Sequence, residues 1–136
     1  MNQVVVKQEK SGYQIVEAYK SLRTNLQFCG EDKKVIAVTS CTPNEGKSSV
    51  SMQLGISLAE SGKRVILIDA DLRKSVLLGR TKTQKSVRGL AHFLSGQATL
   101  EDVICSTNVK NFYMIYSGPF PPNPAELLGG KNFRSL

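Results

Sequence analysis

The sequence predicts an α/β fold in which a mostly parallel sheet is flanked by helices. Two short apolar runs rich in β-branched residues, at 35–38 and 65–68, are typical of buried parallel strands. Apolar residues at helical spacing lie between them, so strand, helix and strand should form a right-handed βαβ unit. Hydrophobic residues make up 40% of the 136 residues and charged residues 21%, a composition typical of one globular domain.

The N-terminal part of this single domain is predicted to contain an arm and a helix. Residues 1–12 show no strand or helix periodicity, so we expect a flexible arm there. Between residues 13 and 28, apolar side chains recur every three or four positions, which predicts an amphipathic helix that ends at Gly30. Residues 33–136 would then form the core of the domain.

The core is predicted to alternate between strands and helices. A helix is expected at 47–61, before Gly62, and the strand at 65–68 leads into Asp69. Further along the chain we expect short helices at 90–94 and 100–104, a strand at 112–116, a proline-rich loop at 117–124 and the start of a helix at 125–128. Three strands are few for an α/β sheet, in which about five or six are usual. We therefore expect an incomplete domain.

Composition excludes several classes of protein. No run of 18 apolar residues occurs, and the N-terminus has no secretory signal pattern, so neither a membrane span nor secretion is expected. The three cysteines include no C-x-x-C spacing, which fits neither a disulfide framework nor a zinc site and indicates a reducing cytoplasm.

The net charge of +7 is unevenly distributed. Six basic residues lie between positions 73 and 88 with no acidic residue among them: Arg73, Lys74, Arg80, Lys82, Lys85 and Arg88. Such a stretch is either a solvated loop or a surface for a polyanion. Since no aromatic residue is interleaved with these charges, we expect no binding of nucleic acid.

The segment between the first strand and the helix predicts a phosphate-binding loop. Backbone N–H groups of such a turn point at nucleotide phosphates, and the helix N-terminus adds a partial positive charge. Gly46 allows close approach of the backbone, Lys47 would bridge the β- and γ-phosphates, and the Ser48 hydroxyl would bind Mg²⁺. The expected nucleotide-binding residues are Thr42, Pro43, Asn44, Glu45, Gly46, Lys47, Ser48 and Ser49.

This loop departs from the strict G-x-x-x-x-G-K-[ST] pattern because Cys41 occupies the first glycine position. Asn44, which tolerates a positive φ better than most residues, would then contribute to the turn. The alternative is an ordinary helix start with the sequence Gly-Lys-Ser. The flanking strand and helix favour the phosphate loop, and with it a P-loop NTPase-like fold.

Two carboxylates, Asp69 and Asp71, follow the second predicted strand. Residues at the carboxyl ends of parallel strands face the ligand crevice of an open sheet. Carboxylates beside a phosphate site are suited to holding Mg²⁺ and to accepting a proton from an attacking hydroxyl. The alternative for Asp71 is a cap at the start of a helix.

Together these motifs resemble the Walker A and Walker A′ pair of the bacterial tyrosine kinases of capsule and exopolysaccharide synthesis. The helix at 13–28 resembles the assembly motif of that family, with Glu17, Lys20 and Arg23 at its positions. Residues 89–96 and the Pro-Pro-Asn-Pro-Ala-Glu-Leu-Leu block at 121–128 are similar to further family segments. The resemblance covers nearly the whole chain from Tyr13 onward.

The resemblance implies an ATP-dependent protein-tyrosine kinase that phosphorylates itself and regulates polysaccharide synthesis or export. Lys47, Asp69 and Asp71 would be its catalytic residues, with Mg²⁺ bound by Ser48, Asp69 and Asp71. It implies a homo-oligomeric ring, protein tyrosine substrates, and activation by the cytoplasmic tail of a membrane-anchored protein. The expected location is the cytoplasm, with recruitment to the inner face of the cell membrane.

Several departures keep two alternatives open. Lys20 stands where the assembly motif usually has Arg, and the family's Walker B strand and C-terminal tyrosine cluster have no counterpart in the 136 residues. One alternative is a non-kinase ATPase switch of the cell-division or partition type, and the other is an inactive, truncated interaction module.

Overall fold

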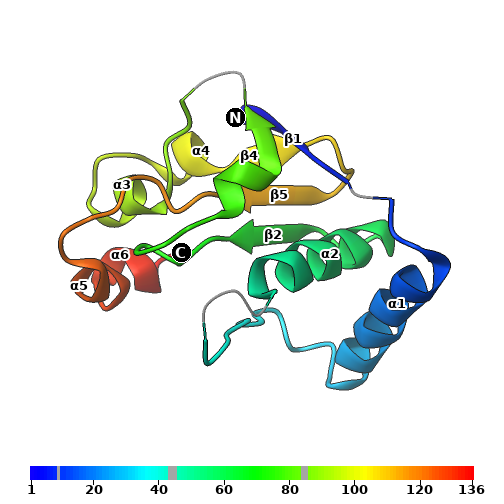
Figure 1. Cartoon of the computed structure of the whole chain (residues 1–136). Helices are drawn as coiled ribbons and strands as arrows, with labels where there is room; N and C mark the ends of the chain where they lie inside the picture. Colours follow the sequence, from blue (N-terminus) through cyan, green and yellow to red (C-terminus); the bar gives the residue numbers. More distant parts are fainter. Residues whose placement is uncertain (9, 43–45, 84–85) are drawn as a thin grey trace.

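The computed structural model describes residues 1–8, 10–42, 46–83 and 86–136. Within them, five strands form one sheet in the order β2-β5-β4-β1-β3 (Figure 1). The strands are β1 (Asn2–Val6), β2 (Val65–Ile68), β3 (Thr81–Thr83), β4 (Cys105–Thr107) and β5 (Phe112–Ile115). The helices are α1 (Tyr13–Phe28), α2 (Lys47–Glu60), η1 (a 3₁₀ turn, Leu77–Arg80), α3 (Leu90–Leu94), α4 (Leu100–Val103), α5 (Pro124–Leu128) and α6 (Lys131–Arg134).

The α/β fold class is confirmed, but the sheet is mixed rather than mostly parallel. Strand β2 pairs with β5 in parallel, and so does β1 with β4. The pairs β4–β5 and β1–β3 are antiparallel. The described strands therefore include a parallel pair, β2 and β5, whose carboxyl ends lie at the same edge of the sheet.

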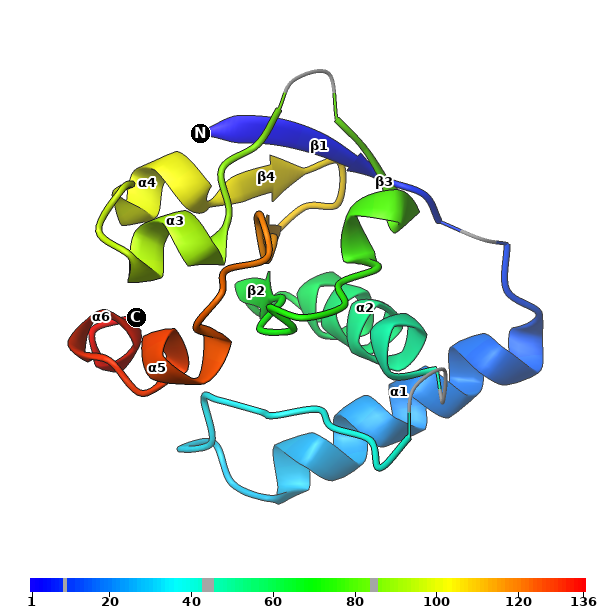
Figure 2. The same ribbon diagram turned by 60° about the vertical axis from the view of Figure 1, so that its left-hand side comes forward.

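The core has one layer on each face of the sheet, because side chains alternate along β5. Phe112 and Met114 pack with Met52 and Ile56 of α2, whereas Ile115 packs with residues of α3 and α4. Contact between α2 and β5 is close: a Cβ added to Gly55 would lie 2.7 Å from the Phe112 ring. Helix α2, which begins at the predicted phosphate loop, is thereby fixed against the sheet. Figure 2 shows α1 on the outer side of α2.

The expected arm at residues 1–12 is wrong over its first half. Residues 2–6 form β1, which lies between β4 and β3. Val4 and Val6 are each only 2% exposed, so the alternating residues of β1 belong to the core. A strand of five residues is too short for its period to stand out in the sequence.

The strand predicted at 35–38 is absent, and this correction removes the expected βαβ unit. The segment has no regular secondary structure, and Val35 is 92% exposed. Strand β2 lies at one end of the sheet and pairs among the described residues with β5 alone. An apolar β-branched run forms a strand only against a neighbouring strand, and the described part of the chain places none beside 35–38.

Most other predicted elements are confirmed, with boundaries that agree within one or two residues. The helices at 13–28 and 47–61 and the strands at 65–68 and 112–116 are present as α1, α2, β2 and β5. The short helices and the proline-rich loop are also present, whereas β3, β4 and α6 were not predicted. No helix among the described residues is long and apolar enough to cross a membrane.

Candidate nucleotide-binding site

The predicted phosphate loop leads into α2 through a left-handed residue. Gly46, the residue before the helix, has φ 82°, a conformation that costs glycine little. Its carbonyl accepts the first helical hydrogen bond, from the N–H of Val50 at 2.9 Å. This explains why a glycine precedes Lys47: the chain must turn sharply into the helix at that point.

The loop residues divide into two sets. Pro43, Asn44 and Glu45 lie outside the described residues, as does Lys85 of the basic stretch. Thr42 is described, and its carbonyl accepts a hydrogen bond from the Ser40 hydroxyl at 3.1 Å. Lys47, Ser48 and Ser49 are half-buried in the first turn of α2. An amino-terminal helical turn with a lysine and two hydroxyls fits a nucleotide phosphate.

The structure brings Lys47 and Asp71 together, as expected of residues that share one site. The Lys47 Nζ atom lies 3.9 Å from Oδ2 of Asp71, and their side chains are 38% and 35% exposed. A pair this exposed contributes little to stability. The pair is informative because of where it lies: it places a cation at the start of α2 beside a carboxylate that follows β2.

Asp69 is held at the carboxyl end of β2 by three hydrogen bonds. Its N–H donates to the carbonyl of Ile115 on β5 at 2.9 Å. Its Oδ1 accepts from the N–H of Asp71 at 3.1 Å, and its Oδ2 accepts from the Ser75 hydroxyl. The carboxylate therefore has a fixed orientation at the sheet edge that also carries Asp71.

Burial raises the pKa of Asp69 above its ordinary value. The hydrogen bonds from Ser75 and Asp71 oppose this shift, the negative charge of Asp71 adds to it, and the Lys47 ammonium group opposes it. A carboxylate with a raised pKa is a better proton acceptor than an ordinary one, which is the property required of a general base.

The alternative that Asp71 caps a helix is wrong, because residues 72–76 form no helix. The Oδ1 atom of Asp71 accepts hydrogen bonds from the N–H groups of Lys74 at 2.9 Å and Arg73 at 3.3 Å, so it closes the turn that follows β2. Its Oδ2 is the atom nearest Lys47. One oxygen thus holds the local backbone while the other faces the phosphate site.

The donor set fits Mg²⁺ bound together with a nucleotide. The described residues contain no group of three or more His, Cys, Asp or Glu side chains placed to hold a metal ion. Mg²⁺ commonly binds one or two carboxylates together with substrate phosphates and waters. Asp69, Asp71 and the Ser48 hydroxyl provide oxygen ligands of the kind that this arrangement requires.

Sequence reasoning missed Ser75, which donates its hydroxyl to Asp69. Its hydroxyl oxygen also accepts a hydrogen bond from the N–H of Leu77 at 3.4 Å. The only available signal was its position six residues after Asp69, on the far side of the turn that Asp71 closes. A single serine in a basic stretch carries no recognisable pattern.

The three predicted assembly residues make contacts within the chain. Lys20 and Glu17 form an exposed ion pair of 3.3 Å along α1. Arg23 donates through Nη1 to the Ser57 carbonyl of α2 at 2.7 Å and to its hydroxyl at 3.3 Å. Arg23 therefore fixes α1 to α2, whereas Glu17 and Lys20 lie at the surface.

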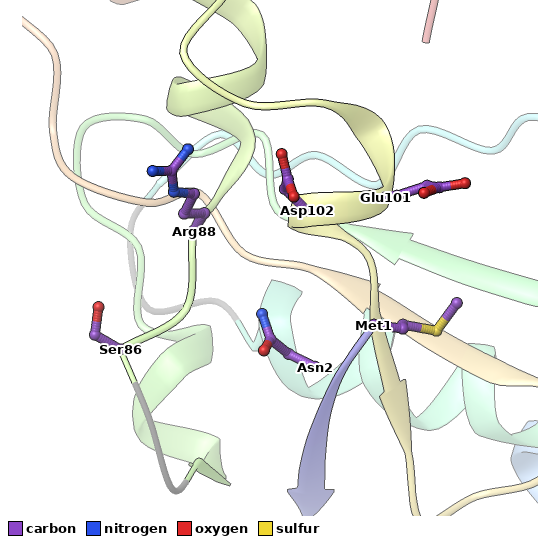
Figure 3. A pocket seen from close by; sticks show the side chains of 6 residues that line it. All are labelled: Met1, Asn2, Ser86, Arg88, Glu101 and Asp102. Carbon is purple, nitrogen blue, oxygen red and sulfur yellow. The ribbon is translucent and has the colours of Figure 1, made fainter.

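A polar pocket of about 300 Å³ is lined by Met1, Asn2, Ser86, Arg88, Glu101 and Asp102 (Figure 3). It contains none of the predicted site residues. Two of its charged side chains already form hydrogen bonds with nearby backbone groups. Arg88 donates to the Gln97 carbonyl at 2.7 Å, and Asp102 accepts from the Thr99 N–H at 2.9 Å. We therefore assign no function to it.

With this geometry established, comparison with known proteins identifies the class of the domain. The family profile described as AAA domain matches residues 33–119, which include the phosphate loop, Asp69 and Asp71. The chain is 44% identical over 120 residues to the tyrosine-protein kinase CpsD of Streptococcus agalactiae, covering 88% of this chain and 52% of that protein. It is 39% identical over 122 residues to the tyrosine-protein kinase YwqD of Bacillus subtilis (strain 168), covering 88% and 51%.

Solved structures agree with these relatives. The BceF tyrosine kinase domain superposes with a TM-score of 0.79 at 43% identity, covering 88% of this chain and 48% of that one. The kinase domain of Escherichia coli tyrosine kinase ETK gives 0.80 at 28% identity, covering 97% and 61%. The chain belongs to the bacterial tyrosine kinase family, and it spans about half the length of the curated relatives it matches.

Proposed function

We propose that this chain supplies the nucleotide-binding half of an ATP-dependent protein-tyrosine kinase that phosphorylates itself and regulates capsule or exopolysaccharide synthesis. The observation that carries the proposal is the approach of Lys47 to Asp71 at the amino-terminal end of α2, with Asp69 fixed two residues away. Relatives that match most of this chain are named tyrosine-protein kinases, which supports tyrosine as the residue that accepts the phosphoryl group.

The residues have complementary roles in this proposal. Lys47 and the backbone N–H groups of the phosphate loop, to which Pro43 contributes none, hold the β- and γ-phosphates of ATP. Ser48 and Asp71 hold Mg²⁺, which when bound neutralises charge on the phosphates. Asp69 either accepts a proton or joins the metal ligands. In the transfer step a tyrosine oxygen bonds to the γ-phosphorus as the bond to the β,γ-bridging oxygen breaks, and the phenol proton passes to a carboxylate as ADP departs.

The proposal extends to assembly and partners. No residue of α1 is buried, and Ile15, Val16 and Leu22 are each more than a third exposed, which leaves an apolar surface beside Glu17 and Lys20. We propose that α1 packs against other copies of the chain in a homo-oligomer. A solved structure titled the chimerical protein CapA2B2 matches with a TM-score of 0.81 at 28% identity, which supports a related architecture. The cytoplasmic tail of a membrane-anchored activator would recruit the protein to the inner membrane face.

Names of the relatives do not favour a non-kinase ATPase switch. An inactive interaction module remains distinguishable by experiment. The test incubates the protein, extended to the length of its relatives, with Mg²⁺ and γ-labelled ATP, followed by phosphoamino-acid analysis. Phosphotyrosine is the expected product. ATP hydrolysis without phosphotyrosine would instead indicate an ATPase switch, and nucleotide binding without either reaction would indicate an interaction module.

A further inference from the structure

A hollow of about 410 Å³ lies beside the carboxylate site, and Ser75 is one of its lining residues. Most of its wall is apolar or aromatic, from Leu78, Val87, Pro119 and Phe120. Leu78 is 55% exposed and Phe120 is 60% exposed. Large apolar side chains gathered around a hollow, rather than scattered singly, indicate a place where an apolar group binds.

The rear of the hollow is held in place by the backbone. The N–H groups of Leu90 and Ala91 donate to the carbonyls of Tyr116 and Ser117 at 2.6 and 2.9 Å. Gly89 lies so close to this loop that an added Cβ would collide with the backbone nitrogen of Gly118. The hollow therefore exists before any ligand arrives, which reduces the entropy cost of binding.

A second constraint fixes the aromatic side of the wall. The Tyr116 hydroxyl and the Thr81 hydroxyl are 2.5 Å apart, and both residues are buried. This hydrogen bond fixes the orientation of the buried Tyr116 ring, and Tyr116 is one of the residues that line the hollow.

Two hydrogen bonds and one ion pair connect the hollow to the phosphate site through Asp69. The Ser75 hydroxyl donates to Oδ2 of Asp69, whose Oδ1 accepts from the N–H of Asp71. Asp71 in turn lies 3.9 Å from Lys47. The hollow and the lysine that meets the phosphates are therefore joined through the two carboxylates, with Asp69 nearest the hollow.

We propose that this hollow is the subsite for the ring of the acceptor tyrosine. The phenol ring packs against Phe120 and Leu78, and its hydroxyl lies at the Ser75 end. There the serine oxygen, which donates its own proton to Asp69, keeps lone pairs that accept from the phenol O–H. This assignment rests on the proposed kinase function and specifies where the phosphoryl acceptor binds.

The test titrates the isotope-labelled 136-residue protein with N-acetyl-tyrosinamide and follows backbone amide signals by NMR. Signals of Ser75, Leu78, Ser117 and Phe120 should shift together. N-acetyl-phenylalaninamide should bind roughly threefold to tenfold more weakly, because it lacks the hydroxyl. Phe120→Ala should weaken binding of the tyrosine probe at least threefold, while Phe133→Ala, at another exposed phenylalanine, should leave it unchanged.

Equal binding of the probe by the Phe120→Ala variant, or shifts at other residues, would overturn the assignment. Displacement of the probe by adenosine without phosphates would also overturn it, since the hollow would then hold a nucleobase. Calorimetry with Mg²⁺ and ATP on the same sample separates the two proposals. Tight nucleotide binding without phenol binding contradicts the acceptor subsite alone, whereas loss of nucleotide binding contradicts the kinase function.

Discussion

Arg23 on α1 donates a 2.7 Å hydrogen bond to the backbone carbonyl of Ser57 on α2. This contact matters because α1 buries none of its own residues, whereas Ser57 is 6% exposed. Within the part of the chain that the structure describes, a charged donor on a carbonyl of this largely buried residue is the strongest hydrogen bond between α1 and another element. A residue that the sequence assigns to assembly thus also has a role within one chain.

Arg23→Ala should therefore destabilise the single chain by about 1–2 kcal/mol, because it removes a charge-assisted hydrogen bond to the Ser57 carbonyl. That carbonyl would keep its helical partner, the Ser61 N–H at 3.2 Å. Urea unfolding followed by circular dichroism measures this loss. Glu17→Ala is the matched control on the same helix and should change stability by less than about 0.5 kcal/mol, because its ion pair with Lys20 is exposed. Light scattering of each variant then separates assembly from folding. If Glu17→Ala gives a smaller assembly without a loss of stability, Glu17 is an interface residue.

Lys47→Met should weaken binding of Mg²⁺-ATP by about tenfold to a hundredfold without changing the fold. The lysine side chain is partly exposed and paired only loosely with Asp71, so its removal costs little stability. Calorimetry measures the affinity. Lys63→Met, at an exposed position just after α2, is the control. Unchanged affinity in the Lys47 variant would contradict the assignment of the phosphate loop.

Gly89→Ala should lower the free energy of unfolding by about 1–3 kcal/mol, because the added methyl group meets backbone rather than a side chain that could move. Gly79→Ala is the control, since an added Cβ there has nothing within 4 Å. Thermal unfolding compares the two variants. If both have the wild-type midpoint, the loop at 117–120 is not packed against Gly89 as described.

The Asp102 carboxylate should stabilise the fold in a pH-dependent way. Hydrogen bonds from Thr99, chiefly its backbone N–H, hold the pKa of Asp102 below its ordinary value. A lowered pKa in the folded state means that the contribution is complete above the ordinary value of 3.8 and is lost as the pH falls through the folded-state pKa. Asp102→Ala should thus lower the melting temperature near pH 6, and this effect should shrink as the pH falls below 3.8.

Differential scanning calorimetry across this range checks the expected pH dependence. Lys110→Ala is the control, because it changes an exposed residue whose side chain is not a carboxylate. A melting-temperature difference between wild type and Asp102→Ala that stays constant from pH 6 to well below pH 3.8 would contradict the role of the carboxylate as a cap.

Elements with strong local signals were predictable from the sequence. The helical spacing of α1 and α2, and the apolar runs of β2 and β5, each lie within one continuous segment. Strand β1 was not predictable, because its partners, β4 and β3, come about 80 to 100 residues later in the chain. For the segment at 35–38 the error is the opposite one. Its composition predicts a strand, but none of the described strands pairs with it.

The candidate site was predictable to a similar extent. Lys47, Asp69 and Asp71 belong to two motifs with recognisable spacing, and the structure places Lys47 beside Asp71. Ser75 could not be predicted, because its contact with Asp69 depends on the turn that Asp71 closes. The hollow beside it combines residues from three separate stretches of chain, which only the fold brings together.

The position of β2 at the end of the sheet has a consequence for handling the protein in solution. One side of β2 lies open to strand pairing among the described residues, Ile66 is 43% exposed, and the apolar segment at 35–38 is exposed as well. Such surfaces promote edge-to-edge aggregation, which like charge on neighbouring molecules opposes. With a net charge of +7, the 136-residue protein should stay dispersed at low ionic strength and precipitate as added salt screens that repulsion.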